Sequence, residues 1–416
     1  MNDFWAHQQF GFRKNSNTTI AVVELMNFIY ESLDNKNSNV CTGLFVDLRK
    51  AFDTVNHELL LKKLFCAGVR GVANELLKSY LVNRKQYVHL RDTDSCMMNV
   101  DIGVPQGSVL GPTLYLIFTN DLSKVELNGK LFLYADDAAL FYANQTDSHN
   151  CVMLNADLNI LGQYFAKNLL TMNISKTKFM HICSYNKLLN EDVIVRIGDQ
   201  VIERVRQYTY LGLILDERLS WSAQCQMVTK RVTSAVGALF KYRSFLNIYD
   251  MYFVFIHSHL FYMVIIWGNA SNVYLRQVQV MQNRALKFVF GLHRLSSTID
   301  VFSEYAKNVL SVKGLHEFCI LKYVRQSLND EILHTFSFQQ LTDSRHMNYD
   351  LRDRHFRLAR PMVRTLFGVR MMTYAGPTLF NKLSNEVRAN TSTRSFALTI
   401  KKHLSTRETL ARLLNK

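Results

Sequence analysis

The sequence predicts a mixed fold of helices and strands, divided into two or three domains over its 416 residues. Two apolar segments with aromatic enrichment, 40–47 and 131–142, have the character of buried strands. Apolar residues at helical spacing predict helices over 20–33 and 147–170. Hydrophobic residues make up 48% of the chain and charged residues 20%, so the chain can bury a sizeable core and is no small disulfide-stapled fold.

Two adjacent carboxylates, Asp136 and Asp137, interrupt the apolar run from Leu131 to Tyr142. The flanking pieces have strand character, so we expect a hairpin with both acids at its tip. Adjacent carboxylates between core strands repel each other and lose hydration unless a cation neutralises them, and Mg²⁺ prefers oxygen ligands of this kind. A metal site is therefore the first hypothesis. An ordinary turn is the alternative, since Asp is favoured in turns.

Two further segments carry candidate chemistry. The strand predicted at 40–47 ends in Asp47, and an acid at the end of a core strand can share a metal with the acids of another strand. A glycine- and proline-containing loop, 103–112, precedes an apolar helix. Glycine permits close backbone approach to a nucleotide, and Gln106 supplies both a donor and an acceptor there. The alternative for this loop is an ordinary turn.

Positive charge is concentrated toward the C-terminus, and two adjacent cations stand near the N-terminus. Arg13 and Lys14 come just before the helix predicted at 20–33, where a cation can hold phosphate, although a capped helix with a basic lead-in explains them equally well. The formal net charge is +15, and the segment from Arg345 to Lys416 alone carries +11. This balance favours nucleic acid as a partner, with a solvated surface as the alternative.

The remaining signals concern compartment and packing. The seven cysteines have no paired spacing that predicts a zinc site or disulfides, and the N-terminus has no secretory signal, so we expect an intracellular protein, in the nucleus and cytoplasm. The apolar run 251–267 is too short to span a bilayer and is predicted to be a buried helix. Segment 208–215 is predicted to be a strand. The buried face of the 147–170 helix is predicted to contain Val152, Leu158, Leu161, Phe165 and Leu169.

The ordered set of motifs resembles the reverse transcriptases of non-LTR retrotransposons, and is most similar to the jockey-like group. Six segments carry this resemblance: 9–13 (QFGFR), 45–47 with 51–53 (FVD and AFD), 103–108 (GVPQGS), 134–137 (YADD), 173–178 (NISKTK) and 210–212 (YLG). The match covers residues 8–215 and extends more weakly through 266–270, 282–286 and 349–352. A maturase-like polymerase of a self-splicing intron shares the YADD signature, but the last two segments favour the retrotransposon.

The resemblance implies an α+β fold of the right-hand polymerase type. Its palm is an antiparallel sheet backed by helices, preceded by partial fingers and followed by a helical thumb and a basic C-terminal region. The corresponding domains are 1–219 for fingers and palm, 220–340 for the thumb and 341–416 for the basic region. The implied activity is RNA-directed DNA polymerisation, with an RNA template, a DNA primer or target and dNTPs as partners, no membrane association and an undetermined oligomeric state.

The resemblance also assigns roles. Asp47 and Asp136 would bridge two Mg²⁺ ions about 4 Å apart, with Mn²⁺ as an alternative, and Asp137 would be a supporting ligand. Lys176 would protonate the leaving pyrophosphate. The other implied sites are nucleotide binding by Arg13, Lys14, Phe52 (which excludes a ribose 2′-hydroxyl), Gln106 and Gly107, and a primer grip at Tyr210, Leu211 and Gly212. Independently of the resemblance, we expect phosphate contacts from an arginine series, partly on one helical face: Arg352, Arg354, Arg357, Arg360 and Arg364.

The sequence also departs from the family pattern. It begins close to Phe10, so the earlier finger strands, including a stretch like Arg-Pro-Ile-Ser, and an endonuclease are missing, and no cysteine and histidine knuckle follows. We expect part of a longer element product, a truncated copy or an incomplete gene model. The alternative function is therefore a catalytically inactive remnant that binds RNA or DNA through its basic regions.

Overall fold

The computed structural model describes residues 4–189, 193–242, 247–334, 336–341 and 356–414. They form two compact units, the first from 1–21 and 37–206, and the second from 22–36 and 207–416. This division differs from the predicted boundaries after residues 219 and 340, because most of an N-terminal helix and the segment 207–219 belong to the second unit. The palm, thumb and C-terminal bounds stay predictions.

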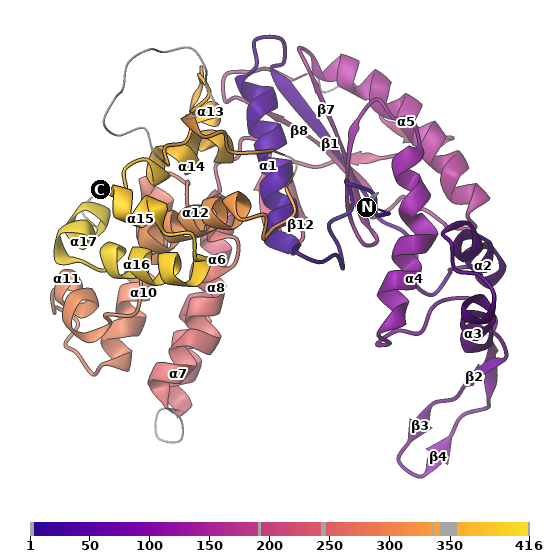
Figure 1. The fold of residues 1–416 in the computed structure, drawn as a ribbon, viewed down its shortest axis with the longest axis horizontal. Helices are drawn as coiled ribbons and strands as arrows, with labels where there is room; N and C mark the ends of the chain where they lie inside the picture. The colour runs from indigo at the N-terminus through magenta and orange to yellow at the C-terminus, as the bar shows by residue number, and fades with distance from the viewer. Residues whose placement is uncertain (1–3, 190–192, 243–246, 335, 342–355, 415–416) are drawn as a thin grey trace. The chain divides into compact units, whose positions relative to one another are not determined.

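A five-stranded sheet forms the centre of the first unit (Figure 1). Its order is β11-β8-β1-β7-β6, and all neighbours are antiparallel except the β11–β8 pair. Its strands are β1 (Val40–Val46), β6 (Lys130–Tyr134), β7 (Asp137–Asn144), β8 (Lys178–Cys183) and β11 (Glu203–Arg204). Every residue of β1 is buried, as its unbroken apolar run predicts. The α+β fold with an antiparallel sheet is confirmed, and so is the β6–β7 hairpin.

Helices pack around this sheet and carry the loops of the site. They are α2 (His57–Cys66), α3 (Val72–Leu81), α4 (Leu110–Thr119) with the 3₁₀ turn η1 (Asn120–Lys124), and α5 (Asp147–Lys167). Helix α5 contacts β1 and β7 (Figure 1). Leu158, Leu161 and Phe165 are buried as predicted, but Val152 is 68% exposed and Leu169 58% exposed. Cys151 occupies the inward position that Val152 was expected to fill, and Leu169 lies beyond the helix end.

Short ribbons complete the first unit. In the first ribbon, β2 (Arg84–Gln86) pairs with β5 (Met98–Val100) and β3 (His89–Leu90) pairs with β4 (Thr93–Asp94). This ribbon extends away from α3 (Figure 1). A second small ribbon joins β9 (Arg196–Ile197) and β10 (Gln200–Val201).

The second unit contains one hairpin and is otherwise helical. The single strand predicted at 208–215 is wrong: β12 (Gln207–Tyr210) and β13 (Leu213–Asp216) pair around a tight turn at Leu211 and Gly212. Both turn residues have positive φ, 45° and 79°, which reverses the chain within two residues. The helices that precede residue 330 are α1 (Thr18–Asp34), α6 (Ser222–Tyr242), α7 (Ile248–Tyr252), α8 (Ser258–Phe261), α9 (Val264–Trp267), α10 (Asn272–Val289), α11 (Thr298–Asp300) and α12 (Val312–Leu328).

The run 251–267 is buried in large part, but it is not one helix. The π-helix η2 (Phe253–His257) separates α7 from α8, and Met263, with φ 52°, separates α8 from α9. A left-handed residue cannot continue a right-handed helix, so the predicted single helix is wrong. In the part of the chain that the structure describes, no helix has both the length and the apolar character needed to cross a membrane.

The C-terminal region packs on α12 within the second unit. A second π-helix, η3 (Val301–Tyr305), precedes α12. Five helices of the described residues follow residue 365: α13 (Leu366–Arg370), α14 (Met372–Phe380), α15 (Asn385–Ala389), α16 (Thr393–Leu404) and α17 (Arg407–Leu414). Helices α14 and α16 both contact α12. Helix α1 joins the same unit, because the buried carboxylate of Asp34 at its end accepts hydrogen bonds from the backbone of Arg364 and Thr365.

Candidate active site

The three predicted catalytic acids lie at one end of adjoining strands. The β1–β7 register pairs Val46 with Ala138, so Asp47 follows β1 at the end where β7 begins with Asp137. Asp136 lies in the two-residue turn, Ala135 and Asp136, that joins β6 to β7. Burial raises the pKa of Asp136, and Asp47 adds to the effect. Burial, then Asp136, then Asp47 raise the pKa of Asp137 to about 6.

The strand register places the three carboxylates at one end of the sheet, and the raised pKa values of Asp136 and Asp137 agree with this placement. Partial loss of hydration and like-charge repulsion both favour a bound cation, and all three donors are hard oxygen ligands. They fit the divalent metal chemistry of their predicted role. Among the described residues, however, no three His, Cys, Asp or Glu side chains are grouped closely enough to hold an ion together. The acids thus form an electrostatic cluster and not a closed coordination shell.

The backbone of Asp47 is held by a loop that lies far from it in the sequence. The amide of Asn173 donates a 2.8 Å hydrogen bond to the carbonyl of Asp47, and the amide of Asp47 donates to the hydroxyl of Thr177 at 3.2 Å. Thr177 is fully buried. Lys176 is exposed in the same loop and makes no ion pair with Asp47 among the described residues. The loop therefore fixes the backbone of Asp47 and carries Lys176 next to that support.

The ring of Phe52 stacks on the ring of Tyr115. Its ring centroid is 4.4 Å from that of Tyr115, with an interplanar angle of 26°. Burial raises the pKa of Tyr115, and Asp136 and Asp137 raise it further, so this tyrosine lies within electrostatic range of both acids. Phe52 and the three predicted catalytic acids therefore belong to one region of the first unit.

The glycine-rich loop is fastened to the segment that carries Phe52. The amide of Val104 donates to the carbonyl of Phe52 at 2.9 Å, and Nε2 of Gln106 donates to Oδ1 of Asp53 at 2.6 Å. Asp53 thus orients the loop. Gly107, with φ 77°, is exposed and has open space where a side chain would be. The structure therefore brings Phe52, Gln106 and Gly107 together as predicted.

Arg13 belongs to a segment that joins the free edge of β6. The amide of Phe10 donates to the carbonyl of Leu133 at 2.8 Å, and a guanidinium nitrogen of Arg13 donates to the carbonyls of Ala6 and Gln9. Lys14 is exposed. Arg13 therefore helps shape its own segment, a role that the sequence did not indicate.

A family model described as reverse transcriptase (RNA-dependent DNA polymerase) matches residues 1–215, the part of the chain that contains this site. The chain belongs to the reverse transcriptase family. A probable RNA-directed DNA polymerase from transposon BS of Drosophila melanogaster is 32% identical over 298 residues, which are 68% of this chain and 32% of that protein. The RNA-directed DNA polymerase from the mobile element jockey of the same species is 28% identical over 309 residues, 70% of this chain and 33% of that one.

The predicted resemblance to jockey-like reverse transcriptases is therefore confirmed. This reverse transcriptase chain spans about a third of the length of the curated relatives that it matches. Among solved structures, a telomerase from Candida albicans in complex with a fragment of telomeric RNA covers 75% of this chain, and this chain covers 55% of it. The TM-score is 0.36 and the identity 11%, which is too low to establish a common fold.

The predicted primer grip of this reverse transcriptase lies in the second unit. Tyr210 is buried at the end of β12, while Leu211 and Gly212 form the turn. The hydroxyl of Tyr262 donates a 2.6 Å hydrogen bond to the carbonyl of Leu211. A hollow of about 480 Å³ adjoins this turn, lined by Gly212, Tyr262 and residues of α6 and α8 that include Arg231 and His259. Burial lowers the pKa of His259, and Arg231 lowers it further.

The arginine series departs from its prediction. Arg352 and Arg354, like segment 349–352, lie outside the described residues. Arg357, Arg360 and Arg364 lie in the irregular segment 356–365, so the expected helical face is wrong for the part that the structure describes. Arg364 donates to the carbonyl of Asp34, and the Arg360 guanidinium lies 5.9 Å from the centre of the Tyr374 ring. These two arginines take part in packing within the second unit.

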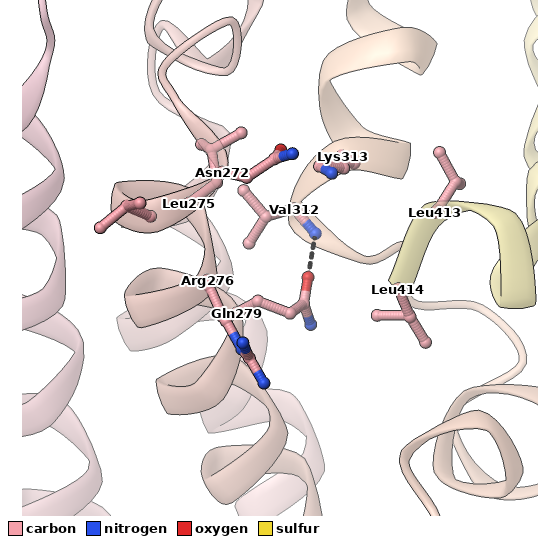
Figure 2. Close-up of a pocket in the computed structure, with 9 residues that line it drawn as sticks. Asn272, Leu275, Arg276, Gln279, Val312, Lys313, Leu413 and Leu414 are labelled. Atoms are coloured by element: carbon pink, nitrogen blue, oxygen red, sulfur yellow. Dashed lines mark hydrogen bonds between the residues drawn. The ribbon is translucent and has the colours of Figure 1, made fainter. Parts of the chain in front are cut away.

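A pocket of about 380 Å³ lies in the second unit at the starts of α10 and α12 and at α17 (Figure 2). Arg276 and Lys313 contribute positive charge, Leu275 and Leu413 contribute apolar surface, and the side-chain oxygen of Gln279 accepts from the amide of Val312 at 2.8 Å. No acidic residue lines this pocket among the described residues. The sequence did not predict it, because its walls come from three separate helices.

Sequence reasoning missed the supports of the site. Tyr115 stacks on Phe52, Thr177 holds Asp47, Gln9 contacts the turn before Asp136, and Tyr262 contacts the predicted primer grip. Gln9 and Thr177 stood inside recognised motifs, QFGFR and NISKTK, but the motifs did not indicate these contacts. Tyr115 and Tyr262 stood outside the motifs, and no local pattern distinguishes them from core residues.

Proposed function

We propose that this chain is an RNA-directed DNA polymerase that extends the 3′-hydroxyl of a primer with dNTPs along an RNA template. The observation that carries the proposal is the electrostatic cluster of Asp47, Asp136 and Asp137, in a chain that belongs to the reverse transcriptase family. Carboxyl groups whose pKa is raised by burial and by a neighbouring carboxylate, as at Asp136 and Asp137, are typical of functional sites, because such repulsion is costly unless a ligand relieves it.

The cluster would hold Mg²⁺, two ions on the family pattern, with Mn²⁺ as an alternative. When bound, such ions lower the pKa of an attacking hydroxyl and neutralise the charge that develops on transferred phosphoryl groups. The protein's contribution is to hold three oxygen ligands on backbone that is fixed by hydrogen bonds. Asp136 belongs to the two-residue turn between β6 and β7, Asp137 is the first residue of β7, and the backbone of Asp47 is held by Asn173 and Thr177. Ligands on rigid elements keep their geometry better than ligands on free loops.

The neighbouring residues would bind and select the nucleotide. Phe52, braced by Tyr115, would exclude a ribose 2′-hydroxyl by its bulk. Gln106 and Gly107 would line the pocket, since the exposed glycine lets a ligand approach the backbone closely. Arg13 and Lys14 would contribute positive charge toward the triphosphate, and Lys176 would donate a proton to the pyrophosphate leaving group.

Nucleic acid would be bound through positive charge spread over the chain. The formal net charge of +15 favours a polyanionic partner, and RNA template and DNA primer or target are the partners that the family implies. Tyr210, Leu211 and Gly212 would contact the primer end. Arg357, Arg360 and Arg364 would add phosphate contacts where their structural interactions leave donors available.

The decisive experiment is primer extension on an RNA template with purified protein, with and without Mg²⁺. We expect Mg²⁺-dependent DNA synthesis from the wild type and none from Asp136→Asn, because an amide loses a charged metal ligand. RNA affinity in that variant should stay within about threefold of the wild type, since the basic surface is unchanged. Asp92→Asn, on the exposed β3–β4 ribbon, is the matched control and should extend normally.

Two outcomes would contradict the proposal. An inactive wild type under every metal condition would mean that this copy does not polymerise DNA. Full activity of Asp136→Asn would mean that the cluster is not the catalytic centre.

A further inference from the structure

The side chain of Gln9 joins the N-terminal segment to the turn that carries Asp136. Its Oε1 accepts a hydrogen bond from the amide of Gly11 at 2.8 Å and another from the amide of Ala135 at 3.0 Å. Only 3% of Gln9 is exposed. Both partners are N–H donors, so only the oxygen end of the amide can satisfy them, which defines the orientation of the side chain.

The backbone around Gln9 places this contact firmly. The amide of Phe10 donates to the carbonyl of Leu133, and the amide of Leu133 donates to the carbonyl of Gln8, each at 2.8 Å. Gln9 and Leu133 thereby form a parallel bridge along β6, at the edge of the sheet. The segment is therefore attached to the strand that leads directly into the catalytic turn.

The turn itself needs such support. Ala135 has φ 56°, in the left-handed region, which is unfavourable for a residue with a side chain. Gly11 permits the close approach, because a Cβ at this position would lie 2.5 Å from the amide nitrogen of Ala135. A buried acceptor that is already in place thus holds the unfavourable conformation immediately before Asp136.

We propose that Gln9 is a positioning residue for Asp136. By fixing the amide of Ala135, its side chain holds the turn in the conformation that presents the Asp136 carboxylate to its ligand. This inference rests on the proposed function, because it assigns Gln9 to the same metal and nucleotide chemistry. Gln9 lies 126 positions before Ala135 in the sequence. The role proposed above for its motif, QFGFR, concerned only Arg13 at the end of the motif.

The test compares Gln9→Met with Gln8→Met. Methionine has a similar length and an apolar tip, so it keeps the volume and removes the acceptor, while the side chain of Gln8 has no hydrogen bond among the described residues. The first readout is Mn²⁺ affinity of the free protein, measured by electron paramagnetic resonance. We expect Gln9→Met to bind Mn²⁺ about tenfold more weakly and Gln8→Met to match the wild type.

The second readout is the single-turnover rate of nucleotide addition at saturating template-primer. A displaced carboxylate should lower this rate about tenfold to a hundredfold in Gln9→Met. The affinity for template-primer should change by less than about twofold, because no phosphate contact is lost. Gly11→Ala should reproduce both effects, since the added Cβ would lie 2.5 Å from the amide nitrogen of Ala135 and 3.1 Å from Oε1 of Gln9, which forces the two apart while the Gln9 side chain keeps its acceptor.

The outcomes separate the two proposals. Equal Mn²⁺ affinity and rate in the Gln9 and Gln8 variants would overturn the positioning role, and so would an unfolded Gln9→Met, which would make Gln9 a residue of general stability. If the wild type binds Mn²⁺ but makes no DNA, the proposed function fails while the Mn²⁺ comparison still decides the role of Gln9.

Discussion

The phenolic hydroxyl of Tyr262 donates a 2.6 Å hydrogen bond to the carbonyl of Leu211, 51 positions earlier in the chain. The same ring lies 3.3 Å from the position of a Cβ on Gly212. Tyr262 ends α8, and its own carbonyl accepts from the indole of Trp267 at 2.9 Å. A helical segment thus holds the β12–β13 turn, which the family pattern assigns to the primer.

Tyr262→Phe should weaken primer binding and leave the fold intact. A lost hydrogen bond of this kind is worth about 0.5 to 1.5 kcal/mol, so we expect template-primer affinity to fall about two- to tenfold. Fluorescence anisotropy with a labelled primer measures the effect. Tyr274→Phe on α10 is the control, because its hydroxyl has no partner among the described residues. Identical affinities for the two variants would show that the turn needs no support from Tyr262.

Asp137 should make stability depend on pH when no metal is bound. Its pKa is raised to about 6 from an ordinary value of 3.8, so the folded state favours the neutral carboxyl. That contribution is fully present below about pH 3.8 and is lost as the pH rises through about 6. Asp137→Asn removes the titration. Urea denaturation in EDTA should therefore show the variant gaining stability relative to wild type between pH 4 and about 7.

The same titration predicts how metal and protons compete. Mg²⁺ requires the carboxylate form, so Mg²⁺-dependent stabilisation of the wild type should increase as the pH rises through about 6. A difference between variant and wild type that stays constant with pH would contradict the raised pKa of Asp137.

Phe52→Val should admit ribonucleotides. The change removes the ring that stacks on Tyr115 and opens space beside the acids. Discrimination by pocket shape is typically worth about 10- to 200-fold, so the preference for dNTPs over rNTPs should fall by at least about tenfold. Competing single-nucleotide additions give this ratio directly. Phe65→Val, on the exposed side of α2, should leave it unchanged, and unchanged selectivity in Phe52→Val would exclude the gate.

Asp34→Ala should destabilise the second unit. The carboxylate is 8% exposed, and it accepts from the amides of Arg364 and Thr365 and from the Thr365 hydroxyl. Removing the acceptor leaves these donors unsatisfied, so we expect a loss of about 2 to 3 kcal/mol in the free energy of unfolding. Asp34→Asn keeps one acceptor oxygen and should lose less. Equal losses in both variants, measured by urea denaturation, would contradict this account.

This contact also changes how the basic tail can be tested. Residues 366–414 form helices, two of which pack on α12, and Arg364 and Thr365 bind Asp34. Deleting the tail would therefore remove part of a folded unit. Single substitutions of exposed arginines, followed by the slope of log affinity against log salt, are the appropriate measurement of phosphate contacts.

Local patterns were sufficient for the strands and most helices of the first unit. The apolar run before Asp47 is β1, and the aromatic run around Asp136 is the β6–β7 hairpin. The side chain of Asn56 caps α2 by accepting from the amide of Leu59. Side-chain periodicity and turn chemistry determine such elements because their causes lie within a few residues of each other.

The same local reasoning failed where distant contacts decided the conformation. Nothing near Met263 signals a break, yet its φ is 52° and the predicted single helix ends there. Distant contacts also decide the compact unit that most of helix α1 joins, because Asp34 at its end binds backbone more than 300 residues away. Favourable tertiary contacts can offset the cost of a left-handed backbone conformation, about 1 to 2 kcal/mol. Helical propensity does not include such contacts.

By itself the sequence predicted which groups would do chemistry: Asp47, Asp136 and Asp137, with Phe52 and Gln106, are specified by residue type and motif order. Only the tertiary structure decided how these groups are held. Gln9 reaches Ala135, Thr177 reaches Asp47, and Tyr115 stacks on Phe52. The physical reason is that the charge or ring of a side chain is specified by the sequence alone, whereas a hydrogen bond of 3 Å forms only after the sheet has brought its two partners together.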